Sequence, residues 1–151
     1  MRINYNKGHI NDTIFYDVTI ADSSDNYQIE ELYNSFINNW NELYKQKQAF
    51  SMIFNLTQLS SAPPKYCKRL ANYIKSIKKL PKQYLTFSIV VINNPIVKGI
   101  IGIIFKLTKP IAPMYIVESA DMAIELMNHI TGNNIILESF ILINEIKVVH
   151  P

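Results

Sequence analysis

Three histidines and one cysteine are the residues of this chain that could bind a metal ion or act as a nucleophile. His9, His129 and His150 lie far apart, and none is at metal-ligand spacing from another histidine, the cysteine or paired carboxylates. Cys67 follows Tyr66 in a stretch with no histidine to accept its proton. We predict surface histidines, a structural cysteine, no metal site and no catalytic residue.

Phosphate binding and acid–base chemistry find equally little support. The segment Lys98–Gly102 lacks the Gly-Lys-Ser/Thr order of a phosphate-binding loop. The close carboxylates, Glu30 with Glu31 and Glu118 with Asp121, stand where helices are expected to begin, and there they complement the helix dipole. We therefore expect a protein that is not an enzyme and has no cofactor.

A basic stretch is the first feature that indicates binding. Residues 64–82 contain seven lysines and arginines and no acidic residue, whereas a solvated helix face normally mixes both signs. The alternatives are an ordinary solvated face and a surface for anionic lipid headgroups or an acidic protein. Nucleic acid is not expected, because no aromatic stacking platform accompanies the charges. The candidate residues for an anionic surface are Lys68, Arg69, Lys75, Lys78, Lys79 and Lys82.

An unusually apolar stretch is the second feature. If residues 96–108 form a helix, its apolar side chains cover about 200° of the circumference, twice what packing on a sheet requires. The apolar surface of the helix that the sheet does not bury must be covered by the tail at 135–149, by an apolar ligand or membrane, or by another protein. The candidate ligand-binding residues are Ile96, Ile100, Ile101, Ile104 and Phe105.

The bulk properties of the chain are those of one globular domain. The 151 residues are 48% hydrophobic and 18% charged, and the formal net charge is +3. No apolar run approaches the ~20 residues that span a bilayer, and no secretory signal is visible. A single cysteine allows no internal disulfide. We expect a single domain over residues 1–151, located in the cytoplasm.

Strand and helix patterns alternate along the chain. The sequence predicts a hairpin in residues 1–21, buried strands at 49–56 and 84–92, and a short strand at 114–117. Helices are predicted from about residue 26 to 44, at 64–80, at 96–108 and after Ser119. Trp40 and Phe36 should face the sheet. Residues 135–149 are compatible with a strand or a helix, and an extended edge strand is favoured.

The stretch IVVINNPIVKGIIGIIFKLTKPIAPMYIVESADMAIELM, residues 89–127, resembles the second half of a CRAL-TRIO domain. In that family a buried strand leads to an Asn/Ala-Pro turn, here Asn94-Pro95. An apolar helix then ends near Lys-Pro, here Lys109-Pro110, before a strand and a short helix with an acidic first turn. Residues 49–82 also match. The same order resembles the STAS domain, whose core is related and whose N-terminal hairpin and small size are similar.

This resemblance implies an α/β fold of STAS/CRAL-TRIO type: a mainly parallel sheet of about five strands with an N-terminal hairpin and about four helices. The CRAL-TRIO resemblance implies a non-catalytic module that binds a lipid or another hydrophobic small molecule at an anionic membrane surface. The STAS resemblance implies instead a protein-interaction or regulatory domain, with a protein partner or a homodimer. The Asp-Ser-Ser-Gly-like phosphorylation motif of many STAS regulators is absent, because LTQLSSAPPKY stands in its place.

Overall fold

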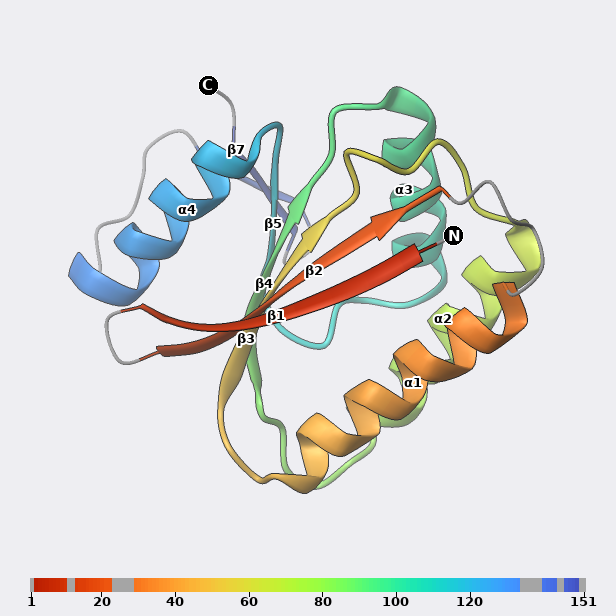
Figure 1. Ribbon diagram of the computed structural model, residues 1–151, viewed down its shortest axis with the longest axis horizontal. Coiled ribbons are helices and arrows are strands. Elements are labelled where there is room, and N and C mark those ends of the chain that lie inside the picture. The colour runs from red at the N-terminus through yellow and green to blue at the C-terminus, as the bar shows by residue number, and fades with distance from the viewer. Residues whose placement is uncertain (1, 11–12, 23–28, 134–139, 144–145, 150–151) are drawn as a thin grey trace.

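The structure is a computed structural model, and it describes residues 2–10, 13–22, 29–133, 140–143 and 146–149. Within these ranges one sheet is covered by helices on both faces (Figure 1). The strands are β1 (Arg2–Ile10), β2 (Thr13–Ala21), β3 (Phe50–Asn55), β4 (Leu85–Val91), β5 (Met114–Val117), β6 (Phe140–Ile143) and β7 (Ile146–Val149). The helices are α1 (Ile29–Lys45), α2 (Pro64–Lys78), α3 (Pro95–Leu107) and α4 (Ala120–Asn128), the last continued by a π-helical turn (His129–Asn133).

The sheet is mainly parallel, as the alternation of strands and helices predicts. Its order is β1-β2-β3-β4-β5-β7-β6. The strands β2, β3, β4, β5 and β7 run parallel, while β1 and β6 pair antiparallel with β2 and β7 at the two edges. The α/β class, the N-terminal hairpin and the four helices are therefore confirmed.

Three helices share one face of the sheet. Each crossover from β2 to β5 advances to the next strand in the same direction, and right-handed crossovers then place α1, α2 and α3 on one side. Figure 1 shows these helices opposite α4, which covers the other side. The alternation along β4 separates the two cores: Val90 and Ile92 pack toward α3, and Ile89 and Val91 pack toward α4.

Short polar side chains and prolines fix where the helices begin. Pro64 occupies the first turn of α2, where a missing N–H costs no hydrogen bond. The side chain of Asn94 accepts a hydrogen bond of 2.8 Å from the amide of Ile96 at the start of α3. Ser119 caps α4 in the same way, through a 3.2 Å bond from the amide of Met122.

The aromatic side of α1 packs onto the sheet as predicted. Trp40 is buried and its indole lies parallel to the ring of Phe54 on β3, with centroids 6.3 Å apart. Phe36 lies one turn earlier, and its ring is 6.3 Å from the same Phe54 ring. Such aromatic pairs add to the free energy gained from burial alone. The contacts anchor α1 above β2 and β3.

The C-terminal segment differs from the expected single edge strand. Its described residues form two antiparallel strands, and β7 lies between β5 and β6, so that β6 is the edge. Residues 134–139 and 144–145 are outside the described ranges. Because the strands extend the sheet, they do not cover α3: Ile96 and Ile103 on its outer side are 64% and 55% exposed. A run of apolar residues could not by itself reveal that it contains two strands.

Candidate ligand-binding cavity

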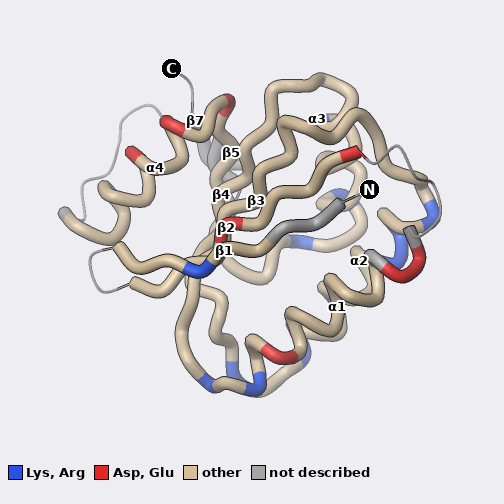
Figure 2. The backbone as a smooth tube through the Cα atoms, viewed as in Figure 1, with Lys and Arg blue, Asp and Glu red and all other residues tan. Residues whose placement is uncertain are grey.

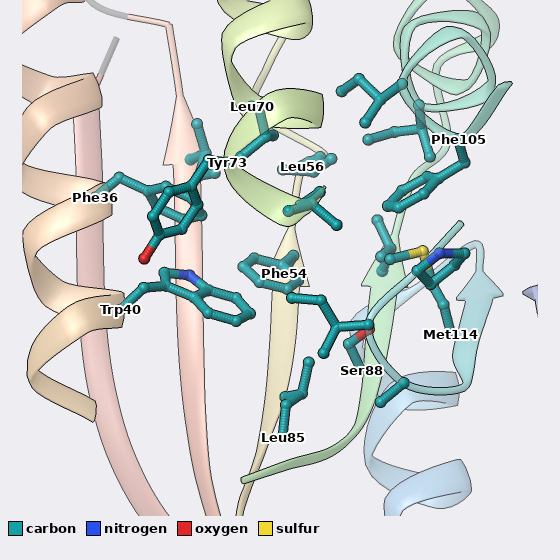
Figure 3. A pocket seen from close by; sticks show the side chains of 18 residues that line it. Phe36, Trp40, Phe54, Leu56, Leu70, Tyr73, Leu85, Ser88, Phe105 and Met114 are labelled. Atoms are coloured by element: carbon teal, nitrogen blue, oxygen red, sulfur yellow. The ribbon is translucent and has the colours of Figure 1, made fainter. Parts of the chain in front are cut away.

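Two apolar cavities lie between the sheet and the three helices that share one face. The first has a volume of about 120 Å³ and is bounded by α1, α2, α3, the sheet and the loop after α3 (Figure 3). The second, of about 130 Å³, lies toward the first turns of α2 and α3. The two adjoin, because six residues line both: Ile20, Phe36, Leu56, Leu70, Ile101 and Ile104.

The walls of these cavities carry no charge. Among the described residues that line them there is no Lys, Arg, His, Asp or Glu. An ionised group without a partner is strongly disfavoured in such a place. An engineered apolar cavity of about 150 Å³ stays dry and binds benzene. The space is therefore suited to a small uncharged molecule or to one segment of a longer apolar chain.

The first cavity has three polar positions in its wall. Tyr73 is already engaged, because its hydroxyl donates a hydrogen bond of 2.7 Å to Asn41. The indole Nε1–H of Trp40 is buried and has no acceptor among the described residues. Ser88 on β4 is 2% exposed. Figure 3 shows Ser88 and Trp40 on different sides of the same cavity.

Ser88 differs from the other buried serine of the sheet. Ser51 on the neighbouring strand β3 is 0% exposed, and its hydroxyl lies 2.8 Å from the hydroxyl of Thr86, with which it shares a hydrogen bond. The Ser88 hydroxyl has no hydrogen bond to another described residue, although its backbone amide donates to Pro113. A buried hydroxyl without a partner is unfavourable, so its position in an otherwise apolar wall requires an explanation.

A polar clasp joins α1 to α2 beside the second cavity. The carboxylate of Glu30 accepts hydrogen bonds from Arg69 (2.7 Å) and from the hydroxyl of Tyr66 (2.8 Å). The guanidinium of Arg69 lies 4.3 Å from the ring centre of Tyr33. These hydrogen bonds hold the pKa of Glu30 below its usual value, Arg69 being the largest cause. Tyr33 and Tyr66 both line the second cavity, so the clasp fixes part of its wall.

The structure distributes the predicted apolar residues of α3 over two surfaces. Ile101 and Ile104 line both cavities, Phe105 lines the first and Ile100 lines the second. Ile96 lines neither, and together with Ile103 and Leu107 it forms an exposed stripe, which we call the α3 stripe. The wide apolar arc thus has an inner part that bounds the cavities and an outer part that faces solvent.

The predicted basic residues are divided as well. Lys68, Lys75 and Lys78 are exposed on α2, and Lys79 and Lys82 are exposed just after its end. Arg69 belongs to the clasp with Glu30 and is not free to bind an anion. Lys78 donates a hydrogen bond of 3.3 Å to the carbonyl of Lys109, which places the end of α2 beside the end of α3. On the helical wheel Lys68, Lys75 and Lys78 lie toward α3 and its stripe.

The two faces of the sheet differ in charge, although α1 on the face with the cavities also carries Glu30, Glu31 and Glu42. Residues 110–133, which include β5 and α4, contain Glu118, Asp121 and Glu125 and no lysine or arginine. Figure 2 shows only red positions along α4, while blue positions occur on α2 and α3. The face with the cavities is therefore the more basic one.

Other sites for chemistry are not assembled within the described residues. No group of three His, Cys, Asp or Glu side chains could hold a metal ion there. Cys67 is buried against α3, and burial raises the pKa of its thiol. His9 is exposed, the Nδ1 atom of His129 is buried without a partner, and His150 lies outside the described ranges. The carboxyl ends of β4 and β5 carry Asn94 and Ser119, which already cap their own helices.

The sequence indicated the residues of α3 that line the cavities, but it did not indicate the residues that line their other sides. Trp40, Phe54 and Ser88 come from three elements that meet only in the fold. One signal was present: Ser88 is the polar residue in the stretch Phe87–Val91 of β4, where all other residues are buried and aliphatic or aromatic. Only the fold shows that the Ser88 hydroxyl has no hydrogen-bond partner among the described residues.

Comparison with known proteins gives no match: no family model, no curated protein and no solved structure is significantly similar to this chain. The fold and the cavities therefore define the molecule as an α/β protein with an open, mainly parallel sheet and an apolar interior space under three helices. Among the described helices none is both long and apolar enough to cross a bilayer.

Proposed function

We propose that this protein is a non-catalytic module that binds a small hydrophobic molecule or one chain of a lipid. The observation that carries the proposal is the pair of adjoining apolar cavities bounded by Ile101 and Ile104 of α3. A domain of this size normally fills such space with side chains, since interiors are close-packed. The CRAL-TRIO resemblance of residues 89–127 points to the same class of ligand.

The outer surface supports delivery of the ligand from a membrane. The α3 stripe offers exposed apolar side chains, and the lysines of α2 lie beside it. Apolar side chains that enter the interface, together with lysines near anionic headgroups, give membrane affinity of this kind, at about 1 kcal/mol per lysine. We therefore propose that α2 and α3 face an anionic membrane while the cavity accepts the ligand.

The test is occupancy of the cavity by a small apolar probe, with two variants of the same helix. Benzene should shift the methyl resonances of Ile101 and Ile104 in carbon–proton correlation spectra. Ile101→Phe fills the space and should abolish the shift of the Ile104 methyl resonances. Ile103→Phe makes the same change on the exposed side and should retain this shift. Native mass spectrometry of the purified protein should in addition reveal a copurified apolar molecule.

The contrary result is equally clear. If benzene leaves the methyl resonances unchanged in the parent protein, the cavity does not bind apolar molecules and the proposal is wrong. The STAS resemblance then supplies the second candidate, a protein-interaction domain. The exposed α3 stripe favours it, because a contiguous apolar surface is also suited to a protein partner or a second copy. Dimers in the same mass spectra would support that function.

A further inference from the structure

Two hydrogen-bonding groups without partners line the same cavity of about 120 Å³. One is the indole Nε1–H of Trp40, which is a donor only and is buried within the wall, with almost no surface open to the cavity. The other is the hydroxyl of Ser88, which lines the cavity and has no hydrogen bond to another described residue. Trp40 is 6% exposed and Ser88 is 2% exposed, so bulk water does not satisfy either group. All other described residues of this wall are apolar, apart from Tyr73, whose hydroxyl is bound to Asn41.

We propose that the ligand is an uncharged and mainly apolar molecule that carries a hydrogen-bond acceptor, such as a ketone, ester or ether oxygen, and that this oxygen accepts a hydrogen bond from Ser88. The inference rests on the proposed function and specifies its ligand. A buried donor without an acceptor costs free energy, and an acceptor on the ligand recovers it. A hydrocarbon of the same shape cannot do so.

The same wall rejects a charged headgroup. An ionised carboxylate or phosphate would enter a space without a lysine, arginine or histidine among its described lining residues. The cost of removing such an ion from water far exceeds what one or two neutral donors return. Any charged part of a longer ligand must therefore remain outside the cavity, at the basic surface of α2. The cavity should therefore not bind a fatty-acid anion in an orientation that places its carboxylate inside.

The experiment compares two probes of nearly identical shape, cyclohexanone and methylenecyclohexane. Both are six-membered rings, and they differ in having an oxygen or a methylene group at one position. Affinities for the parent protein and its variants are measured by titration of the methyl resonances of Ile101 and Ile104. Ser88→Ala removes the hydroxyl, and Trp40→Phe removes the indole N–H but keeps an aromatic ring. Ser51→Ala is the matched control, because it removes a buried hydroxyl that already has a partner in Thr86.

We expect Ser88→Ala to lose about two- to tenfold in affinity for the ketone, the range for one neutral hydrogen bond. Its affinity for the hydrocarbon should not fall by a comparable factor, and Ser51→Ala should change neither. Trp40→Phe should change the affinities for both probes by similar factors, because the indole N–H is not accessible from the cavity.

The possible failures are distinct. If neither probe binds, the proposed function itself is wrong. If both probes bind and Ser88→Ala does not change the preference between them, the cavity binds apolar molecules without recognising an oxygen, and only the inference about the ligand class is overturned. Circular dichroism of Trp40→Phe shows whether the variant is folded, and Ser88→Ala provides a change too small to disturb the packing.

Discussion

At the scale of single residues, the two buried serines of the central strands show how context decides the role of a side chain. Ser51 and Ser88 lie on adjacent strands and are equally inaccessible to water. Ser51 shares a hydrogen bond with Thr86 and therefore contributes to stability, whereas Ser88 faces a cavity. A residue retained at a cost in stability is a candidate for binding.

Replacement of these two serines by alanine should change the stability of the ligand-free protein in opposite directions. Ser88→Ala removes a hydroxyl without a partner and should raise the free energy of unfolding by about 1 kcal/mol. Ser51→Ala leaves Thr86 with one hydrogen bond fewer and should lower it by about 1 kcal/mol. Urea unfolding followed by Trp40 fluorescence measures both values. Destabilisation by Ser88→Ala would show that its hydroxyl is already bound in the free protein.

Cys67 should be a slow nucleophile. Burial against α3 raises the pKa of the thiol above its ordinary value of 9.0, so that less thiolate is present at any pH near neutrality. Alkylation by iodoacetamide at pH 8 should therefore be much slower in the folded protein than in urea, and its rate should rise at a higher pH than for the unfolded chain. Equal rates in both states would contradict the burial of this side chain.

At the scale of elements, the clasp between α1 and α2 shapes the second cavity from outside. Its ion pair joins the exposed Glu30 to the half-buried Arg69, and ion pairs near the surface contribute little to stability in general. The clasp has a more specific consequence, because Arg69 holds the ring of Tyr33 and Glu30 holds the hydroxyl of Tyr66. Both rings are part of the cavity wall. The packing of α1 against α2 therefore depends on the ionised carboxylate of Glu30.

The clasp should weaken in acid. The pKa of Glu30 is lower in the folded protein than its ordinary value of 4.5, so its contribution to stability is present above about pH 4.5 and is lost as the pH falls through the lowered pKa. Glu30→Gln should destabilise the protein at pH 6, and this difference should shrink in more acid solution. Urea unfolding between pH 6 and pH 3 tests it, with the adjacent exposed Glu31→Gln as control. A difference that does not depend on pH would contradict the assignment.

The elements were largely predictable because their signals are local. Pro64, Asn94 and Ser119 mark helix starts in the sequence and occupy those positions in the structure. The exception is the C-terminal segment, where the pairing of β7 with β5 is a long-range contact that no local pattern specifies. The cavity was half predictable for the same reason: the arc of α3 is local, while the meeting of Trp40 with Ser88 depends on the whole fold.

At the scale of the whole molecule, charge and apolar surface coincide on one side. Lysines of α2 accompany the α3 stripe, and the acidic positions around α4 lie across the sheet (Figure 2). A molecule with this distribution should orient itself at an anionic surface with its cavity side toward the lipid. The attraction should be sensitive to salt, because exposed charges are screened over about 8 Å at physiological ionic strength.

Binding to vesicles tests this orientation. The parent protein should sediment with vesicles of anionic phospholipid at low salt, should dissociate as salt is raised, and should bind neutral vesicles weakly. The triple variant Lys68→Glu/Lys75→Glu/Lys78→Glu should not bind. The control is the triple variant Lys7→Glu/Lys45→Glu/Lys47→Glu, which changes the net charge equally but at other exposed residues. It should bind only moderately less than the parent protein. Equal losses in the two triple variants would show that net charge alone acts.

The order of the strands has a consequence for how the chain folds as it is made. From β1 to β5 each new strand pairs with the one synthesised just before it, so the sheet can grow by one strand at a time during translation. This regularity ends at β5, whose other edge pairs with β7. Until residues 146–149 have left the ribosome, β5 is an unpaired and hydrophobic edge, and at that stage the nascent chain is most exposed to pairing with another copy.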